Sequence, residues 1–338
     1  MTSLPLLPAT RLTEDASIAV PIVCGAMYPC SNPELVAASS QAGALGVFQP
    51  ISLTYVHGYA FRAGIRKIRS LTDRPIGMNA LIEQSSKFYR RRTEEWIDTA
   101  LEEGVRFFVT SLGKPDWVVR RVESVGARVY HDVTTRKWAQ KGLDCGVHGL
   151  MAVNSRAGGH AGQLDAQALL DEVGDLGLPV VCAGGVGNQE DFVAALRMGY
   201  AGVQMGTRFI ASQECTASAE YKQAIVDAGE NDIVHSERLT GVPVAVINTP
   251  FIRKLGLSAG PLARWMLRGR RTKHWMRMIY ALKSFRQLRR SLHATSVGGD
   301  YWQAGKSVSG IATVEPVASI VRRFSEAARS AGVPTSEE

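Results

Sequence analysis

The 338-residue chain lacks any Cys-x-x-Cys pair, and its five cysteines form an odd, scattered set. This pattern argues against both a disulfide framework and a structural zinc site. The chain also lacks an uninterrupted apolar run of about 18 residues, so no membrane-spanning helix is expected. Residues 1–12 have neither the charged start nor the apolar stretch of a signal peptide. We therefore expect a reduced, cytoplasmic protein without a bound metal.

Acidic residues are missing from Arg238 to Gly299, a span that contains thirteen lysines and arginines. The formal net charge of the whole chain is +8, so the rest of the sequence is net acidic. Charge asymmetry of this kind usually marks a surface that faces an anionic partner. From Lys273 onward, apolar and basic residues separate as they do around an amphipathic helix.

A pattern of short apolar run, turn and helical stretch repeats eight times before Pro250. Several runs are apolar throughout, which is typical of parallel strands buried on both faces. Eight such units fit a closed (β/α)8 TIM barrel better than an open doubly wound sheet, although counting alone does not show closure. We expect one barrel domain over residues 1–338, with residues 253–295 as a basic helical insertion. The runs cover residues 18–27, 44–50, 75–82, 105–113, 127–134, 148–154, 179–187 and 201–209, and helical stretch 218–229 follows the last.

Glycine-rich loops follow the seventh and eighth predicted strands, where TIM barrels usually bind phosphate. Glycine lets the backbone approach a ligand closely and point N–H groups at it. Either loop alone could be a tight turn, but two at consecutive strand ends favour a phosphate site. The residues assigned to this site are Ala183, Gly184, Gly185, Gly187, the helix start at Asn188, and the hydroxyl of Thr207.

A third glycine-rich loop, residues 152–163, surrounds His160 with small neighbours. No His-x-His or His-Glu-x-x-His pattern accompanies this histidine, which disfavours a metal. An imidazole that titrates near neutrality can accept a proton from a carbon acid, a contribution of roughly 100- to 10,000-fold in rate. We therefore predict that His160 is catalytic, with a purely structural loop histidine as the alternative.

Three segments at these separations, RAGGHAG, PVVCAGGVG and QMGTRF, together with PIVCGAM near the N-terminus, resemble the nitronate monooxygenase family. This family of FMN-dependent TIM barrels also includes flavin enoyl-thioester reductases and NAD(P)H:quinone reductases. The resemblance runs from residue 18 to residue 250 and returns at AGKSVSGI. It implies that the phosphorylated ligand is FMN, and it makes NAD(P)H a candidate electron donor.

The resemblance also implies which residues bind the flavin. Gly158 and Gly185 match flavin-binding glycines, Asn79 matches an asparagine of the third strand, and Met27 is placed beside the flavin ring. His160 matches the base of nitronate oxidation. The other implied cofactor-binding residues are Gly184, Gln204, Met205, Gly206 and Thr207.

The chain departs from the family just before the histidine loop. Where the family commonly has Gln-Gly-x-Glu, residues 153–156 read Val-Asn-Ser-Arg, so a polar flavin contact is lost and Arg156 replaces a carboxylate. This departure affects the expected substrate more than the cofactor. His131 and Asp132 end the fifth predicted strand on the active face. We expect that they assist His160, bind substrate, or are satisfied by loop amides.

Three functions are compatible with these residues. The leading hypothesis is oxidation of alkyl nitronates with dioxygen by an FMN enzyme that uses His160. The second is an NAD(P)H-dependent flavin reductase of enoyl thioesters or quinones, in which residues 253–293 dock an acidic carrier protein or an anionic membrane. The third is a protein without flavin that binds membranes or nucleic acid. Nucleic acid is the least favoured partner because no nucleic-acid motif accompanies the charge. Two alternatives to a docking role remain for residues 253–293: a lid over the flavin, or a solvated helix packed on the barrel.

Overall fold

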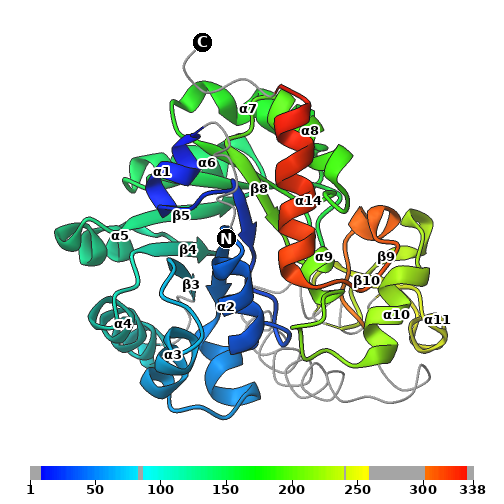
Figure 1. The fold of residues 1–338 in the computed structure, drawn as a ribbon, viewed down its shortest axis with the longest axis horizontal. Helices are drawn as coiled ribbons and strands as arrows, with labels where there is room; N and C mark the ends of the chain where they lie inside the picture. Colours follow the sequence, from blue (N-terminus) through cyan, green and yellow to red (C-terminus); the bar gives the residue numbers. More distant parts are fainter. Residues whose placement is uncertain (1–8, 83–86, 240, 259–300, 333–338) are drawn as a thin grey trace.

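A computed structural model describes residues 9–82, 87–239, 241–258 and 301–332. Eight parallel strands close into a barrel in chain order, with β8 paired to β1 (Figure 1). The predicted TIM barrel is confirmed, and the closed ring of pairs rules out an open sheet. The strands are β1 (Ile22–Cys24), β2 (Leu45–Phe48), β3 (Ile76–Leu81), β4 (Phe107–Ser111), β5 (Arg128–Val133), β6 (Gly149–Val153), β7 (Val180–Ala183) and β8 (Gly202–Met205).

Apolar side chains fill the inside of the barrel, because successive residues of a strand point to opposite faces. A packed interior leaves no pore, so a ligand must bind at an end of the barrel. The buried interior strand residues are Val23, Leu45, Val47, Phe107, Val109, Tyr130, Met151 and Val181.

The short helix α1 (Arg11–Ala16) closes the N-terminal end of the barrel. Its Leu12 has no exposed surface, and a Cβ at Gly202 of β8 would come within 2.5 Å of Leu12 Cδ2. The Tyr130 hydroxyl donates to Asp15 Oδ2 at 3.0 Å and joins β5 to α1. The carboxyl ends of the strands therefore form the end that a ligand can reach.

We expect Leu12→Ala to lower the free energy of unfolding by about 2–5 kcal/mol, because it removes a fully buried side chain and leaves a cavity. Chemical denaturation followed by circular dichroism measures the loss. Leu71→Ala, at a position 42% exposed, is the matched control and should change stability by less than about 0.5 kcal/mol. Equal stabilities for the two variants would contradict the role given to α1.

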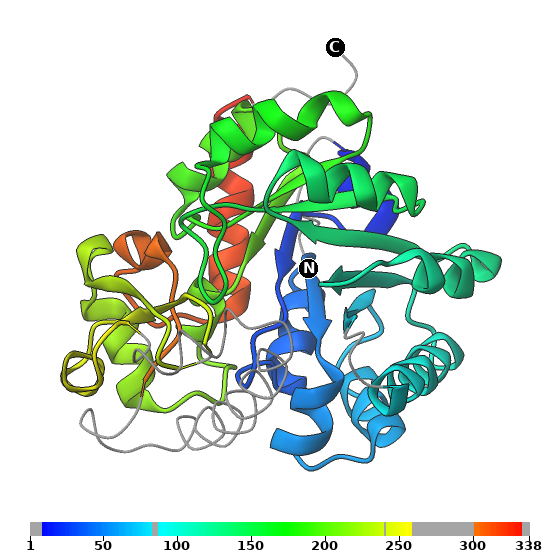
Figure 2. The same ribbon diagram turned by 180° about the vertical axis from the view of Figure 1, so that it is seen from behind.

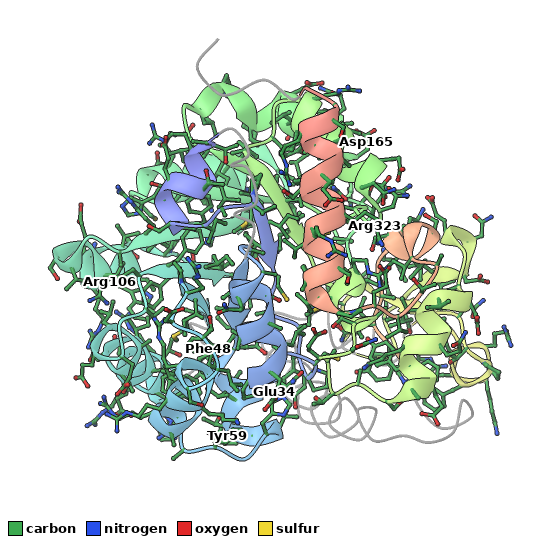
Figure 3. The ribbon with its side chains drawn as sticks, in the orientation of Figure 1. Glu34, Phe48, Tyr59, Arg106, Asp165 and Arg323 are labelled. Carbon is green, nitrogen blue, oxygen red and sulfur yellow. The ribbon has the colours of Figure 1, made fainter. Side chains whose placement is uncertain are left out.

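Helices alternate with the strands and cover the outside of the barrel (Figures 1 and 2). Phe48, labelled in Figure 3, is buried in the core, and its ring centroid lies 6.1 Å from that of Phe61. The helices that follow β1 to β7 are α2 (Pro33–Gln41), the π-helix η1 (Ser52–Val56), α3 (Phe61–Arg69), α4 (Lys87–Glu102), α5 (Asp116–Val122), α6 (Arg136–Asp144), α7 (Ala166–Val173) and α8 (Gln189–Arg197), with short 3-10 turns η2 (Glu123–Val125) and η3 (Gly174–Leu176).

The eighth position of the outer layer is filled by α14 (Val317–Ser330), which packs against α8 and α2. Arg323 of α14 donates to Gln189 Oε1 at 3.1 Å, and Figure 3 labels it on that helix. The prediction that residues 218–229 form the eighth barrel helix is wrong. They form α10 (Ala219–Asp227), which lies beside the barrel, because β8 is followed only by the four-residue α9 (Thr207–Ile210) before the chain leaves the outer layer.

A β-hairpin that the sequence pattern did not predict lies beside α10 (Figures 1 and 2). Its strands β9 (Ile233–Ser236) and β10 (Val244–Ile247) are antiparallel. Ala245 N–H donates to the Gly159 carbonyl at 2.8 Å, so the hairpin supports the histidine loop. The neighbouring elements are η4 (Glu230–Asp232), α11 (Pro250–Leu255) and η5 (Lys306–Gly310).

The basic insertion lies largely outside the described residues, which stop at 258 and resume at 301. Its beginning falls in α11, and the helix predicted from Lys273 stays a prediction. Within the described ranges, no helix combines the length and apolar character needed to cross a lipid bilayer.

Candidate active site

Polar side chains line the inward face where β2 to β5 end. Gln49 follows β2, Asn79 lies in β3, Ser111 ends β4 and Asp132 lies near the end of β5. Each of them occupies the inward register of its strand, as Asp132 does two residues beyond the interior residue Tyr130. The floor of the barrel mouth is therefore polar on this side.

Hydrogen bonds join these side chains into a row in which every donor points toward Asp132. Ser52 Oγ donates to Gln49 Oε1 at 3.2 Å, and Gln49 Nε2 donates to Asn79 Oδ1 at 3.3 Å. Asn79 Nδ2 lies 3.4 Å from Ser111 Oγ, and the Ser111 hydroxyl donates to Asp132 Oδ2 at 2.5 Å. Aligned donors polarise one another, so the row stabilises negative charge on the Asp132 carboxylate.

The adjacent residues His131 and Asp132 point to opposite faces of β5. The His131 ring packs toward α6, its Nδ1 lies 2.9 Å from Thr110 Oγ1, and burial lowers its pKa to about 4. The hypothesis that both residues serve the site is wrong for His131, because a side chain on the outer face cannot reach the mouth. Asp132 bonds to a side chain of β4 instead of loop amides, and burial raises its pKa to about 6 against the opposing effect of Ser111.

The loop after β7 and the turn after β8 form a glycine cradle, defined by Gly184, Gly185, Gly206 and Thr207. Gly184 and Gly185 have φ angles of +122° and +84°, which glycine adopts without the penalty of a Cβ. Among the described residues, no acceptor faces the amide N–H groups of Gly185, Gly206 and Thr207. Free N–H groups at these two strand ends can hold a phosphate.

Two residues assigned to the phosphate site, Gly187 and Asn188, also have structural contacts. A Cβ on Gly187 would lie 2.1 Å from the Ser307 carbonyl oxygen, so this glycine permits a close approach of η5. Asn188 and Asp191 form a capping box at the start of α8, and Asp191 Oδ2 also accepts the Gly187 N–H at 3.0 Å. The capping box occupies the amides of Asn188 and Asp191, whereas no acceptor among the described residues meets those of Gln189 and Glu190, so the prediction that the start of α8 offers amides to a ligand stays a prediction.

The C-terminal segment returns to the cradle. Gly305 N–H donates to Thr207 Oγ1 at 3.0 Å, which leaves the Thr207 hydroxyl hydrogen for a ligand. Lys306 N–H donates to the Arg156 carbonyl at 2.9 Å. A Cβ on Gly158 would lie 3.0 Å from the Gly305 nitrogen, so the two glycine backbones pack closely. The histidine loop and the cradle are thus joined through residues 305 and 306.

Arg156 places a cation at the rim of the cradle. A Cβ on Gly185 would meet Arg156 Nε at 2.9 Å. Glu230 Oε1 lies 2.8 Å from Arg156 Nη1 and 3.4 Å from Lys306 Nζ. Desolvation opposes ionisation of Glu230, but these two cations lower its pKa overall. With two cations and one carboxylate, this rim keeps a net positive charge.

Asn154, one of the residues that depart from the family pattern, has a structural role. It is fully buried, and its Nδ2 donates to the Gly184 carbonyl at 2.9 Å. Its Oδ1 accepts the Arg156 N–H at 2.9 Å. The residue therefore fixes the histidine loop against the cradle.

His160 is exposed, and one of its ring nitrogens is engaged. Nδ1 lies 3.1 Å from the Pro243 carbonyl oxygen, and because a carbonyl only accepts, Nδ1 carries the hydrogen. The neutral ring then has its lone pair at Nε2, which is the form that a general base requires. The contact with Pro243 fixes this tautomer at the edge of the mouth.

The remaining predicted cofactor residues are placed on two faces of the barrel. A Cβ on Gly25 would meet Gln204 Cγ at 2.9 Å, and one on Gly206 would meet Met27 Sδ at 3.3 Å. Gln204 and Met27 therefore lie over the strand ends near the cradle. The Met205 side chain is buried in the core outside the barrel, so only its backbone can face a ligand.

Sequence reasoning missed Gln49, Ser111, Gly305 and Lys306. Strand alternation could have found the first two, since each lies two residues beyond an inward apolar position. The family resemblance returns at AGKSVSGI, which contains residues 305 and 306, but it did not assign them to the cradle, where the folded chain brings them.

A closed TIM barrel with a glycine cradle after β7 and β8 and a histidine in the loop after β6 is compatible with a cofactor-dependent barrel enzyme. The family model for nitronate monooxygenase matches residues 9–324. The chain belongs to this family and is a flavin-dependent oxidoreductase.

Individual relatives have different activities. The chain is 32% identical, over 73% of its length and 67% of the relative, to the (3aS,4S,5R,7aS)-5-hydroxy-7a-methyl-1-oxo-octahydro-1H-indene-4-carboxyl-CoA dehydrogenase of Rhodococcus jostii. It is 29% identical, over 73% of its length and 81% of the relative, to a probable nitronate monooxygenase of Staphylococcus saprophyticus. The structure of FabK from Thermotoga maritima superposes with a TM-score of 0.79 at 27% identity, over 96% of this chain and 97% of FabK.

Proposed function

We propose that the chain binds FMN at the barrel mouth and transfers hydrogen to or from an acyl thioester. FMN is typical of the family, and the residues present fit it. The unpaired amides of Gly185, Gly206 and Thr207 suit its phosphate. Across the closed barrel, the polar row that includes Asn79 and Asp132 suits the polar edge of a flavin ring.

The single observation that carries the chemistry is the state of His160 in the loop after β6: its Nδ1 is bonded to the Pro243 carbonyl, and its Nε2 has no partner among the described residues. A bound FMN supplies hydride transfer. His160 Nε2 takes the proton from the carbon next to the thioester carbonyl during oxidation and returns it during reduction. The Pro243 carbonyl keeps its bond to Nδ1–H in both protonation states and so holds the ring in position.

The thioester is supported by the relatives and by the rim of the mouth. The carboxyl-CoA dehydrogenase matches at 32% identity. Tyr55, Phe88 and Leu112 follow β2, β3 and β4, and they are 47%, 80% and 61% exposed. Exposed apolar side chains on the segments that follow three adjacent strands suit an acyl chain. The cations Arg156 and Lys306 suit the phosphates of coenzyme A or of a phosphopantetheine arm.

Anaerobic mixing tests the thioester assignment directly. Butyryl-CoA should bleach the visible flavin absorbance of the purified holoenzyme, and crotonyl-CoA should restore the absorbance after chemical reduction. Free butyrate is the matched control, because it lacks the thioester that acidifies the neighbouring carbon. If neither CoA ester changes the flavin spectrum in an enzyme that nitronates bleach rapidly, the thioester assignment fails.

Nitronate oxidation is the second candidate, favoured by the probable nitronate monooxygenase at 29% identity and by a histidine placed to handle a carbon proton. Oxygen consumption with propyl-2-nitronate tests it. Bleaching by NADH or NADPH would identify the electron donor for the reductive direction. An acidic carrier protein or an anionic membrane as the partner of residues 253–293 stays a prediction, because most of that segment lies outside the described residues.

A further inference from the structure

Asp132 has one carboxylate oxygen that the fold leaves without a partner. Its Oδ2 accepts the Ser111 hydroxyl, whereas its Oδ1 is buried and meets no donor among the described residues. Buried acceptors are nearly always hydrogen-bonded, so an exception at a ligand site indicates a donor on the ligand.

The position of Asp132 is consistent with a hydrogen-bond donor on a ligand. It stands in the polar row of β2 to β5, on the side of the closed barrel away from the cradle that follows β7 and β8. A molecule that is held by its phosphate at the cradle and extends across the mouth reaches that row. The far end of the bound molecule is therefore the part that meets Asp132.

No charged side chain of the described elements packed against β5 competes for this oxygen. On the inward face, β4 presents Ser111 and β6 presents Met151 and Val153, which are all uncharged. His131, the adjacent titratable residue, points to the outer face.

Most titratable groups of the adjoining loops have partners of their own, and Lys114, in the loop after β4, is exposed. His160 bonds to the Pro243 carbonyl, and Arg156 and Lys306 share Glu230. The polarity of the hydrogen-bonded row favours the carboxylate form of Asp132, and that form only accepts hydrogen bonds.

We propose that Asp132 is a ligand-binding residue whose Oδ1 accepts a hydrogen bond from an N–H or O–H group of the molecule bound in the mouth. Two molecules can supply this donor, namely the imide N–H of FMN and the hydroxyl of a hydroxyacyl thioester. The second source rests on the proposed thioester function, whereas the first does not.

A pH dependence of binding follows. Only the carboxylate leaves Oδ1 free to accept, and a proton on Asp132 competes with the ligand's donor. Because the Asp132 pKa is raised to about 6, ligand affinity should be full above this pH and fall as the pH drops through it. Ser111→Ala removes the bond that lowers this pKa, so the break should move to higher pH.

The flavin arm of the test uses apoprotein and FMN. Quenching of FMN fluorescence gives the dissociation constant between pH 5 and pH 8. If FMN supplies the donor, Asp132→Asn should weaken binding at pH 8 about 10-fold, because a neutral acceptor replaces a charged one, and should abolish the break near pH 6. Asp144→Asn, at an exposed aspartate bonded to Gln140, is the control and should match wild type.

The substrate arm uses the oxidised holoenzyme, with 3-hydroxybutyryl-CoA and butyryl-CoA as paired probes. If the substrate supplies the donor, wild type should bind the hydroxylated ester at least about 10-fold more tightly, as judged by the flavin spectrum, and Asp132→Asn should remove the difference. In whichever arm responds, Ser111→Ala should raise the pH at which ligand affinity falls. It serves as the second variant if Asp132→Asn does not fold.

A response in either arm supports the proposal and identifies the source of the donor. If FMN affinity, its pH profile and the preference for the hydroxylated ester are all unchanged in Asp132→Asn, the proposal is overturned. If wild type binds neither ester, the thioester function fails and the flavin arm alone decides the role of Asp132.

Discussion

Replacing His160 by alanine should lower substrate turnover about 100- to 10,000-fold while the protein keeps its flavin. The loss has a direct cause, because Nε2 is the ring nitrogen without a partner among the described residues, and alanine supplies no base. The flavin should stay bound because its expected phosphate contacts come from Gly185, Gly206 and Thr207. Steady-state kinetics and the flavin-to-protein absorbance ratio measure the two effects separately.

His160→Asn separates catalysis from loop anchoring. The asparagine amide can donate to the Pro243 carbonyl as Nδ1–H does, but it offers no basic nitrogen at the position of Nε2. We expect this variant to be as impaired as His160→Ala and to have a more stable loop. Near-normal turnover in His160→Asn would show that the histidine only holds the loop to the hairpin.

The barrel itself could be predicted from local patterns. Apolar runs with helical stretches between them identify all eight strands, and glycines at consecutive strand ends place the cradle. The source of the eighth outer helix could not be predicted in this way. Both α10 and α14 are amphipathic, and only packing against α8 and α2 shows which of them completes the layer.

Within the site, glycines of similar sequence context have different physical roles. Gly185 presents a free amide, whereas Gly187 makes room for the Ser307 carbonyl and gives its N–H to Asp191. Sequence context also does not distinguish His131 from Asp132, which share a strand end but point to opposite faces. Residue type and spacing locate the mouth of the barrel, and strand register decides which side chains enter it.

Catalysis and cofactor binding are therefore supported by different parts of the chain. The imidazole depends on the hairpin through Pro243 and Gly159, whereas the cradle depends on Gly305 through Thr207. Substitutions in the two parts should have different effects. Variants of the histidine loop should change turnover, and variants of the cradle should change flavin affinity.

Gly206→Val should yield a folded protein that has lost most of its flavin, with the dissociation constant for FMN raised about 100-fold or more. Gly206 has a negative φ of −111°, so a new side chain avoids the left-handed penalty that applies at Gly185. Its Cβ would meet only the flexible Met27 side chain, at 3.3 Å. The added methyl groups should therefore obstruct the cradle amides rather than the fold.

Gly206 gives a cleaner test than Gly185, where φ is +84° and a Cβ would meet Arg156 at 2.9 Å. Gly174→Ala is the matched control, since that glycine has a helical φ of −65° and lies outside the mouth. Absorbance ratios after purification, reconstitution with FMN and thermal denaturation distinguish lost binding from lost structure. Full flavin occupancy in Gly206→Val, with the stability of wild type, would mean that the phosphate is held elsewhere.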